Sequence, residues 1–279
     1  MTSVSKTNEE KRLIYKTVGE REIELLFYPP YTAVYDRAPL LFLIPGGGWC
    51  MSVARSMYDS ARSLAERLRE NGFAAVAVSY RNHRDDGVMM PAIVDDVFDA
   101  ASYMALHADA LGIDPQRIYT CGHSAGGHLS LLLAYAPCDF GENRVYNAPF
   151  AVRGCVPISP PTVMSHTPEE LARYRFGRGV SHLFKGYQDA FARYSPLWWA
   201  QNGYGVPTMT AAGDRDELVS ATNSEDLCRA LAAHGIRNEL LITHGGGHSL
   251  EPIDCEAVDL SLSDVLLQMT DFVLDENRK

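Results

Sequence analysis

The chain has 279 residues, of which 46% are hydrophobic, and a formal net charge of −10 at pH 7. This charge argues against a nucleic-acid partner, because phosphates are bound by basic surfaces, and it favours a small-molecule substrate. The first residues lack the apolar segment of a signal peptide, and no uncharged apolar stretch approaches the roughly 18 residues of a membrane span. We therefore expect a cytoplasmic protein with no membrane partner, and the sequence leaves a homo-oligomer open.

Length and composition predict one large α/β domain over residues 1–279. Runs of apolar and β-branched residues predict strands, and apolar residues at helical spacing predict helices. In chain order we expect an antiparallel strand pair 13–18 and 23–28 joined at Gly19, strand 40–44, helix 59–71 ended by Gly72, strand 73–79, a long helix opened by Pro91, strand 117–121, helix 125–135, strands 152–158 and 208–212, helix 220–234, strand 239–243 and helix 259–275.

The alternation of strands and helices predicts a mostly parallel sheet covered by helices on both faces. In such sheets, ligands bind beyond the carboxyl ends of the strands, where the loops that follow the strands meet. Four glycine-rich or polar loops follow predicted strands and are therefore expected to converge, at residues 45–49, 122–124, 213–216 and 244–248.

A Gly-x-Ser-x-Gly motif at residues 122–126 stands between a predicted strand and an apolar predicted helix. In such motifs a sharp, strained turn from strand to helix exposes the serine hydroxyl, and the two glycines remove side chains that would collide. We therefore predict that Ser124 is a nucleophile. A glycine-rich structural turn is the alternative interpretation of this stretch.

A serine nucleophile requires a histidine that takes its proton and a carboxylate that orients this histidine. The loops after the last two predicted strands supply both, and each loop offers two candidates. Asp216 is favoured over Asp214, because Asp214 lies in the tight turn directly after Gly213, where a structural role is common. His248 is favoured over His244, because the three glycines before it give its loop the flexibility to reach the serine.

The same two histidines have the i, i+4 spacing of a zinc-binding pair. That geometry requires a helix, and a spacer of three glycines is a poor helix former. We therefore predict no metal site.

Three consecutive glycines, residues 46–48, follow the predicted strand 40–44. Acyl transfer places negative charge on a carbonyl oxygen, and backbone N–H groups of a loop without side chains can approach that oxygen closely. We expect Gly47, Gly48 and the N–H of Ala125 to form this oxyanion hole. The loop matches neither of the common glycine-rich phosphate-binding motifs, and a purely structural turn is the alternative.

A long connection, residues 159–204, separates two predicted strands, and we interpret part of it as a lid over Ser124. Most of its aromatic side chains are expected to pack the insert onto the rest of the protein. Trp49, beside the proposed oxyanion loop, is predicted to bind substrate. His123 is predicted to line the substrate pocket, and a hydrogen-bonded structural role is the alternative. The aromatic residues of the insert include Tyr174, Phe176, Phe184, Tyr187, Phe191, Tyr194, Trp198, Trp199 and Tyr204.

Several motifs together carry a family resemblance. They are Gly-Gly-Gly-Trp at 46–49, Ser-Tyr-Arg at 79–81, Pro-Ala at 91–92 with Asp96, Gly-His-Ser-Ala-Gly-Gly at 122–127, Ser-Pro-Leu at 195–197, Gly-Asp-Arg-Asp-Glu-Leu-Val at 213–219 and Gly-Gly-Gly-His at 245–248. From about residue 22 to the C-terminus, the chain resembles the α/β-hydrolase superfamily, whose nucleophile, acid and base follow the same order. More narrowly, it resembles the small esterases grouped with acetyl-xylan and feruloyl esterases and with hormone-sensitive-lipase-like enzymes.

One residue departs from the pattern of these relatives, many of which have histidine at the position of Pro45. Proline has no N–H and a fixed φ, so it should end the strand at Ile44. It leaves the N–H groups of Gly47 and Gly48 in place.

The resemblance implies hydrolysis of a small-molecule carboxylic ester through an acyl-enzyme, without a cofactor. We expect short acyl esters as substrates, with acetylated or aryl-acylated sugars as candidates. Two other functions are an amidase of the arylformamidase type and a non-catalytic ligand receptor on the same fold. The presence of Ser124, Asp216 and His248 argues against the receptor.

Overall fold

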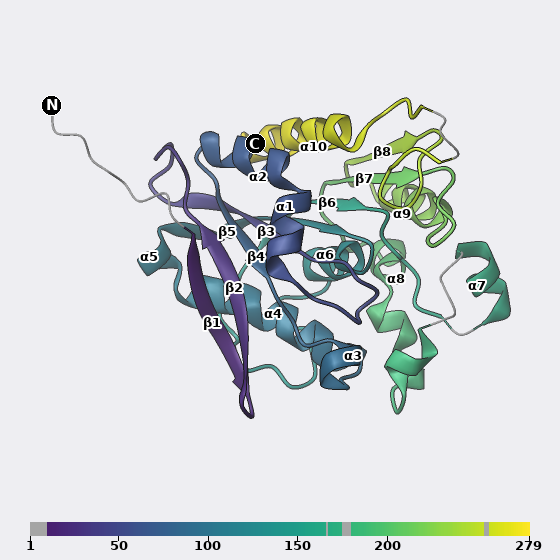
Figure 1. The fold of residues 1–279 in the computed structure, drawn as a ribbon, viewed down its shortest axis with the longest axis horizontal. Coiled ribbons are helices and arrows are strands. Elements are labelled where there is room, and N and C mark those ends of the chain that lie inside the picture. The colour runs from purple at the N-terminus through teal and green to yellow at the C-terminus, as the bar shows by residue number, and fades with distance from the viewer. Residues whose placement is uncertain (1–9, 166, 175–179, 254–256) are drawn as a thin grey trace, which may run out of the picture.

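An eight-stranded sheet runs through the computed structural model, which describes residues 10–165, 167–174, 180–253 and 257–279 (Figure 1). The strand order is β1-β2-β4-β3-β5-β6-β7-β8. The first two strands run antiparallel to their neighbours, and the pairs from β4 to β8 are parallel, as the sequence predicts. The strands are β1 Lys11–Val18, β2 Arg21–Tyr28, β3 Ala38–Ile44, β4 Ala74–Val78, β5 Ile113–His123, β6 Val152–Ile158, β7 Thr208–Gly213 and β8 Asn238–Thr243.

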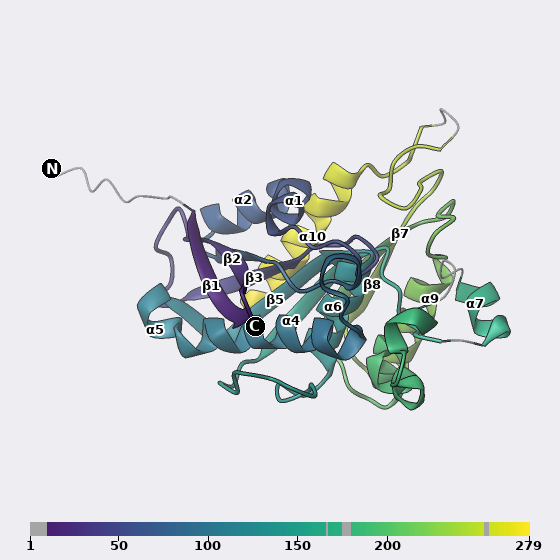
Figure 2. The same cartoon turned by 60° about the horizontal axis from the view of Figure 1, so that its bottom comes forward.

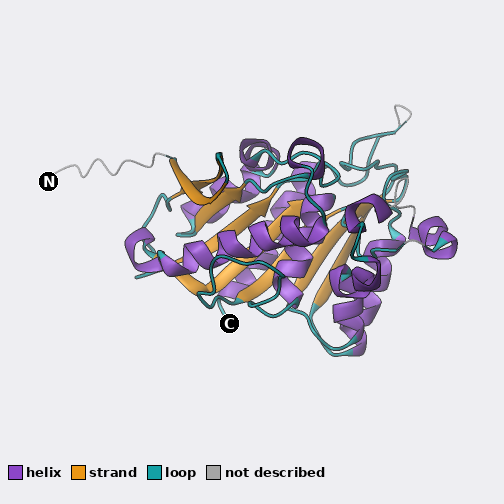
Figure 3. Cartoon of the chain, turned by 90° about the horizontal axis from the view of Figure 1, so that it is seen from below, coloured by secondary structure: helices purple, strands orange, loops and turns teal. Residues whose placement is uncertain are grey.

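Helices cover both faces of this sheet (Figure 2). Side chains of α1, α2 and α10 share one buried cluster with one face of the sheet, and those of α4, α6 and α9 share another with the opposite face. Figure 3 shows the helices crossing the strands. The helices of the α/β body are α1 Ala54–Ser60, α2 Arg62–Glu70, α3 His83–Asp86, α4 Met90–Leu106, α5 Ala108–Leu111, α6 Ala125–Tyr135, α9 Thr222–Ala233 and α10 Leu262–Asn277.

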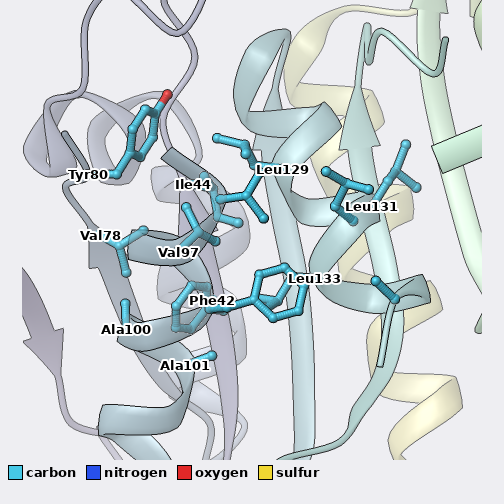
Figure 4. Close-up of a cluster of buried hydrophobic side chains, with 14 of the residues drawn as sticks. Phe42, Ile44, Val78, Tyr80, Val97, Ala100, Ala101, Leu129, Leu131 and Leu133 are labelled. Atoms are coloured by element: carbon cyan, nitrogen blue, oxygen red, sulfur yellow. The ribbon is translucent and has the colours of Figure 1, made fainter. Parts of the chain in front are cut away.

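The core forms because the central strands are apolar on both faces. Every residue of β3 and β4 is buried. Alternate residues of β3 point to opposite faces, so Phe42 joins the cluster with α4 and α6, whereas Leu43 joins the cluster with α1, α2 and α10. Figure 4 shows Phe42 and Val78 of the strands together with Val97 of α4 and Leu129 of α6.

The predicted helix 59–71 is wrong in its start and in its continuity. The structure has two helices there, α1 and α2, separated at Ala61, whose φ and ψ are −101° and 21°. The turn at Ala61 allows side chains of both helices, such as Met57 and Leu64, to reach the same buried cluster. We attribute the break to this burial: it stabilises two helices, each with its own apolar face on the cluster, more than one continuous helix.

A buried ion pair holds the loop that follows β4. The Arg81 side chain donates from Nε and Nη2 to the two carboxylate oxygens of Asp96, each over 2.8 Å. Lys16 Nζ lies 2.8 Å from the same buried carboxylate. Arg81 and Asp96 belong to the motifs noted in the sequence, and their pairing fixes the loop against α4.

The connection between β6 and β7 carries helical segments of its own, which lie beside the β7 and β8 side of the sheet (Figure 1). Four of its aromatic residues, Phe184, Phe191, Tyr194 and Trp199, are buried in the main core cluster, which agrees with the packing role expected for most of them. Phe176 lies outside the described residues. The segments are α7 Pro168–Tyr174, two 3₁₀ helices at Ser181–Phe184 and Gln188–Tyr194, and α8 Pro196–Gln201.

Within the described ranges, the structure contains no helix with the length and apolar character that a membrane span requires.

Candidate active site

Ser124 lies at the sharp turn between β5 and α6. Its φ and ψ are 55° and −122°, a conformation that residues with side chains rarely adopt. A Cβ atom at Gly122 would overlap the carbonyl oxygen of Gly126, and one at Gly126 would overlap the carbonyl oxygen of Ile44. The two glycines of the motif are therefore required for the close approach of α6 to β5 and β3. This is the strand-to-helix turn that the motif predicts.

Gly126→Ala should destabilise the protein strongly, by about 3 kcal/mol or more in the free energy of unfolding, because the added methyl group meets rigid backbone. Denaturant unfolding measures this change. Gly87→Ala is a suitable control, since Gly87 also has a positive φ, 65°, but a Cβ atom added there would meet open space; it should cost only the strain of the left-handed backbone, roughly 1–2 kcal/mol. Equal destabilisation by the two variants would contradict the packing argument.

His248 and Asp216 form a hydrogen-bonded pair across the loops that follow β8 and β7. His248 Nδ1 lies 2.7 Å from Asp216 Oδ2. The other carboxylate oxygen accepts backbone N–H groups from Leu218 and Val219, over 2.8 and 2.9 Å. Asp216 is only 2% exposed. The loop therefore holds the carboxylate in one orientation, and a carboxylate acceptor at Nδ1 leaves Nε2 of a neutral His248 without a proton.

A second pair of the same residue types lies at the surface. His244 Nδ1 is 2.9 Å from Asp214 Oδ2, and the two side chains are 69% and 38% exposed. The hydrogen bond that His244 donates to the Asp214 carboxylate raises the pKa of His244. Asp214 also accepts the N–H of Gly245, over 2.8 Å. This pair ties the loop after β7 to the loop after β8 and does not line the cavity described below.

The glycine loop makes a tight turn directly after β3, which ends at Ile44 as Pro45 predicts. Gly47, Gly48 and Trp49 have φ values of 112°, 61° and 58°. The carbonyl of Gly47 accepts the N–H of Cys50 over 3.0 Å. Trp49 is buried, and its indole Nε1–H donates to His128 Nδ1 over 3.2 Å.

His123 connects the serine turn to the loop of His248. Its Nε2–H donates to the backbone carbonyl of His248 over 2.9 Å, and the centroids of the two rings lie 4.8 Å apart. Burial lowers the pKa of His123. His123 also lines the cavity, so the structure gives it both a hydrogen-bonded role and a place in the pocket wall.

These loops enclose one cavity of about 430 Å³. Ser124 and His248 line it together, with Asp216 buried behind His248. Ala125, the first residue of α6, is fully buried and is not among the lining residues; only its backbone N–H was expected to contribute. The lining residues are Gly47, Gly48, Trp49, His123, Ser124, Pro161, Val180, His182, Leu183, Leu218, Val219 and His248.

The described residues of the insert contribute three apolar side chains and one imidazole to this cavity, and none of the Phe, Tyr or Trp side chains expected from the sequence. Pro161, Val180, His182 and Leu183 are the residues of 159–204 that line it within the described part of the chain. This explains why aromatic content in the sequence did not identify the wall of the pocket.

Among the described residues, no group of three or more His, Cys, Asp or Glu side chains is placed to hold a metal ion.

Solved structures share this fold. Est2, a thermophilic esterase of Thermogutta terrifontis with bound propionate, superposes with a TM-score of 0.75 and 22% identity, over 95% of this chain and 94% of Est2. A truncated carbohydrate esterase from gut microbiota gives a TM-score of 0.74 and 20% identity, over 96% of this chain and 95% of its own. The protein therefore has the α/β-hydrolase fold, as the resemblance in the sequence predicts.

The model of the BD-FAE family matches residues 26–231, and the chain belongs to this family. Two curated relatives from Mycobacterium tuberculosis match shorter stretches. A probable carboxylic ester hydrolase, LipM, is 39% identical over 37% of this chain, and the carboxylesterase NlhH is 30% identical over 48% of it. These matches span only 22% of LipM and 39% of NlhH.

Proposed function

We propose that the protein is a serine hydrolase that cleaves carboxylic esters through an acyl-enzyme, with Ser124, Asp216 and His248 as its catalytic residues. One observation carries this proposal. A histidine oriented by a buried carboxylate, at 2.7 Å, lines the same cavity as a serine held in a strained turn between strand and helix. Turnover of p-nitrophenyl acetate by the purified protein is the first test.

The proposed reaction has two halves. In the first, Ser124 Oγ attacks the ester carbonyl carbon while His248 Nε2 takes the hydroxyl proton. The tetrahedral intermediate collapses when His248 returns this proton to the departing alcohol, which leaves an acyl group on Ser124. In the second half, His248 deprotonates a water molecule that attacks the acyl carbon, and the acid leaves as Ser124 recovers its proton. Asp216 stabilises the imidazolium that forms in each half.

The negative charge of each tetrahedral intermediate needs donors near the carbonyl oxygen. We propose that the backbone N–H groups of Gly47, Gly48 and Ala125 supply them. Gly47 and Gly48 line the cavity beside Ser124, and Ala125 N–H belongs to the first turn of a helix, where N–H groups lack intrahelical partners. Loss of one such donor typically costs about 3 kcal/mol in the activation free energy.

Short acyl esters are the proposed substrates, including acetylated or aryl-acylated sugars. A cavity of about 430 Å³ must accommodate both the acyl group and the alcohol. The structural neighbour Est2 is described with propionate and with butyrate bound, and another neighbour is described as a carbohydrate esterase. These descriptions of other proteins support the proposal of an ester that joins a small acyl group to a sugar hydroxyl.

Among p-nitrophenyl esters of increasing chain length, kcat/KM should be highest for acetate to butyrate and should fall at longer chains. Each methylene that finds an apolar groove would favour binding by about 0.8 kcal/mol. Val180, Leu183, Leu218 and Val219 line the cavity, and we expect this wall to limit how many methylenes can do so. Steady-state kinetics across the series measures this preference, and an optimum at eight carbons or more would contradict it.

An amidase is the second candidate function. Arylacetamide deacetylase of Oryctolagus cuniculus is 39% identical over 99 residues, which cover 34% of this chain and 23% of the relative. The same nucleophile and base can cleave an amide if the leaving amine is protonated. Comparing kcat/KM for p-nitrophenyl acetate with that for an N-formyl aromatic amine separates the two functions.

A further inference from the structure

His128 is a buried histidine on α6 that does not line the cavity, four residues after Ser124. Both of its ring nitrogens have partners. Nδ1 receives the indole N–H of Trp49 over 3.2 Å, and Nε2 lies 2.7 Å from the backbone carbonyl of Tyr194. An indole nitrogen can only donate and a carbonyl can only accept, so these partners fix a neutral ring with its proton on Nε2.

Neutral His128 is also what burial favours. Complete burial lowers the pKa of His128 to about 4. The ring therefore keeps the same tautomer, and the same two hydrogen bonds, at neutral and mildly acidic pH.

Trp49, which donates to Nδ1 of His128, has a strained backbone conformation. Trp49 has a φ of 58° and directly follows Gly47 and Gly48, which also have positive φ. Glycine tolerates this conformation, but a bulky residue adopts it only when surrounding contacts hold it there. The bond to His128 and the edge-to-face packing of the two rings, with centroids 5.2 Å apart, are such contacts.

We propose that His128 is a positioning residue for the oxyanion loop, Gly47–Gly48, and that it acts through Trp49. Its second bond, to Tyr194 in the insert, anchors the ring so that the insert and the oxyanion loop are held by one side chain. This inference rests on the proposed function. It names a role in catalysis for a residue outside the cavity, one that supports the transition state and not the binding of substrate.

The expected effect is specific because oxyanion donors must lie at hydrogen-bond distance from the oxygen of the transition state. If the loop relaxes when Trp49 is released, the transition state loses stabilisation while the substrate in its ground state loses little. In His128→Leu, whose side chain does not line the cavity, a drop in kcat with a small change in KM distinguishes this role from a general loss of the pocket. Trp49 itself lines the cavity, so for Trp49→Phe the measurement that counts is the affinity for a transition-state analogue.

His128→Leu and Trp49→Phe each remove the hydrogen bond between the two rings, and Trp49→Phe leaves the bond to Tyr194 intact. We expect each variant to lower kcat for p-nitrophenyl acetate by about 10- to 100-fold. The inhibition constant of a trifluoromethyl ketone, which forms a tetrahedral adduct with the serine, should rise by a similar factor. The double variant should lose little more than either single variant, because the same bond is removed once.

Leu132→Ala is the matched control, since Leu132 is a buried residue of α6 that does not line the cavity. It should lower the melting temperature through a cavity in the core and leave the inhibition constant within about threefold of wild type. Unchanged inhibitor affinity in folded Trp49→Phe would overturn the inference, even if His128→Leu failed to fold. If the wild-type protein neither hydrolyses p-nitrophenyl acetate nor binds the ketone, the proposed function itself fails instead.

Discussion

Ser124→Ala should lower kcat/KM for p-nitrophenyl acetate by about four orders of magnitude or more, because nucleophile, base and acid act as a unit. The melting temperature should stay close to that of the wild type. Serine and alanine both carry a Cβ atom, so the strain of the positive φ at Ser124 is the same in both, and only a hydroxyl at the cavity wall is lost. Kinetics and thermal unfolding of the purified variant measure the two quantities.

Residual activity above about a hundredth of the wild-type value would exclude Ser124 as the nucleophile. Gly87→Ala, at an exposed turn distant in sequence from the four loops, serves as a control for preparation and folding and should retain full turnover.

Asp216→Asn and His248→Ala should each lower kcat/KM by about four orders of magnitude. Asparagine keeps the shape of Asp216 but cannot stabilise an imidazolium or hold the proton on Nδ1 of His248. The chain supplies its own matched control in the surface pair. Asp214→Asn and His244→Ala break a hydrogen bond of similar length, 2.9 Å against 2.7 Å, and should change kcat/KM by no more than about threefold.

The test compares the loss of kcat/KM in Asp216→Asn and His248→Ala with that in Asp214→Asn and His244→Ala. A large loss of kcat/KM in His244→Ala with retained activity in His248→Ala would reverse the assignment of the base. Equal losses of kcat/KM in all four variants would show that the reaction depends on the conformation of the two loops and not specifically on Asp216 and His248.

Much of the fold could be predicted because burial on both faces leaves a clear local pattern. The predicted range 152–158 coincides with β6, and 40–44 falls within β3. Pro45 and Gly72 mark ends that local chemistry dictates. The break at Ala61 could not be predicted, because alanine favours helix and the turn there depends on packing against a distant part of the sheet.

The candidate site also contains residues that the sequence predicts and residues that it does not. Ser124 stands in a local motif, and Asp216 and His248 follow strands whose ends the sheet topology brings together. The contacts of His123 and His128 span long separations in the sequence: 125 residues from His123 to His248, and 79 and 66 residues from His128 to Trp49 and Tyr194. Local sequence patterns do not predict contacts between residues so far apart in the sequence. The only signal for His128 in the sequence was a histidine directly after the glycines of the motif, and the sequence did not reveal its partners.

Reaction of the wild-type protein with a fluorophosphonate, followed by tryptic digestion and mass spectrometry, tests the central claim most directly. We expect one adduct, in the peptide of residues 118–144, located on Ser124 and absent from Ser124→Ala. An adduct on any other residue, or ester hydrolysis by a protein that forms no adduct, would contradict the account.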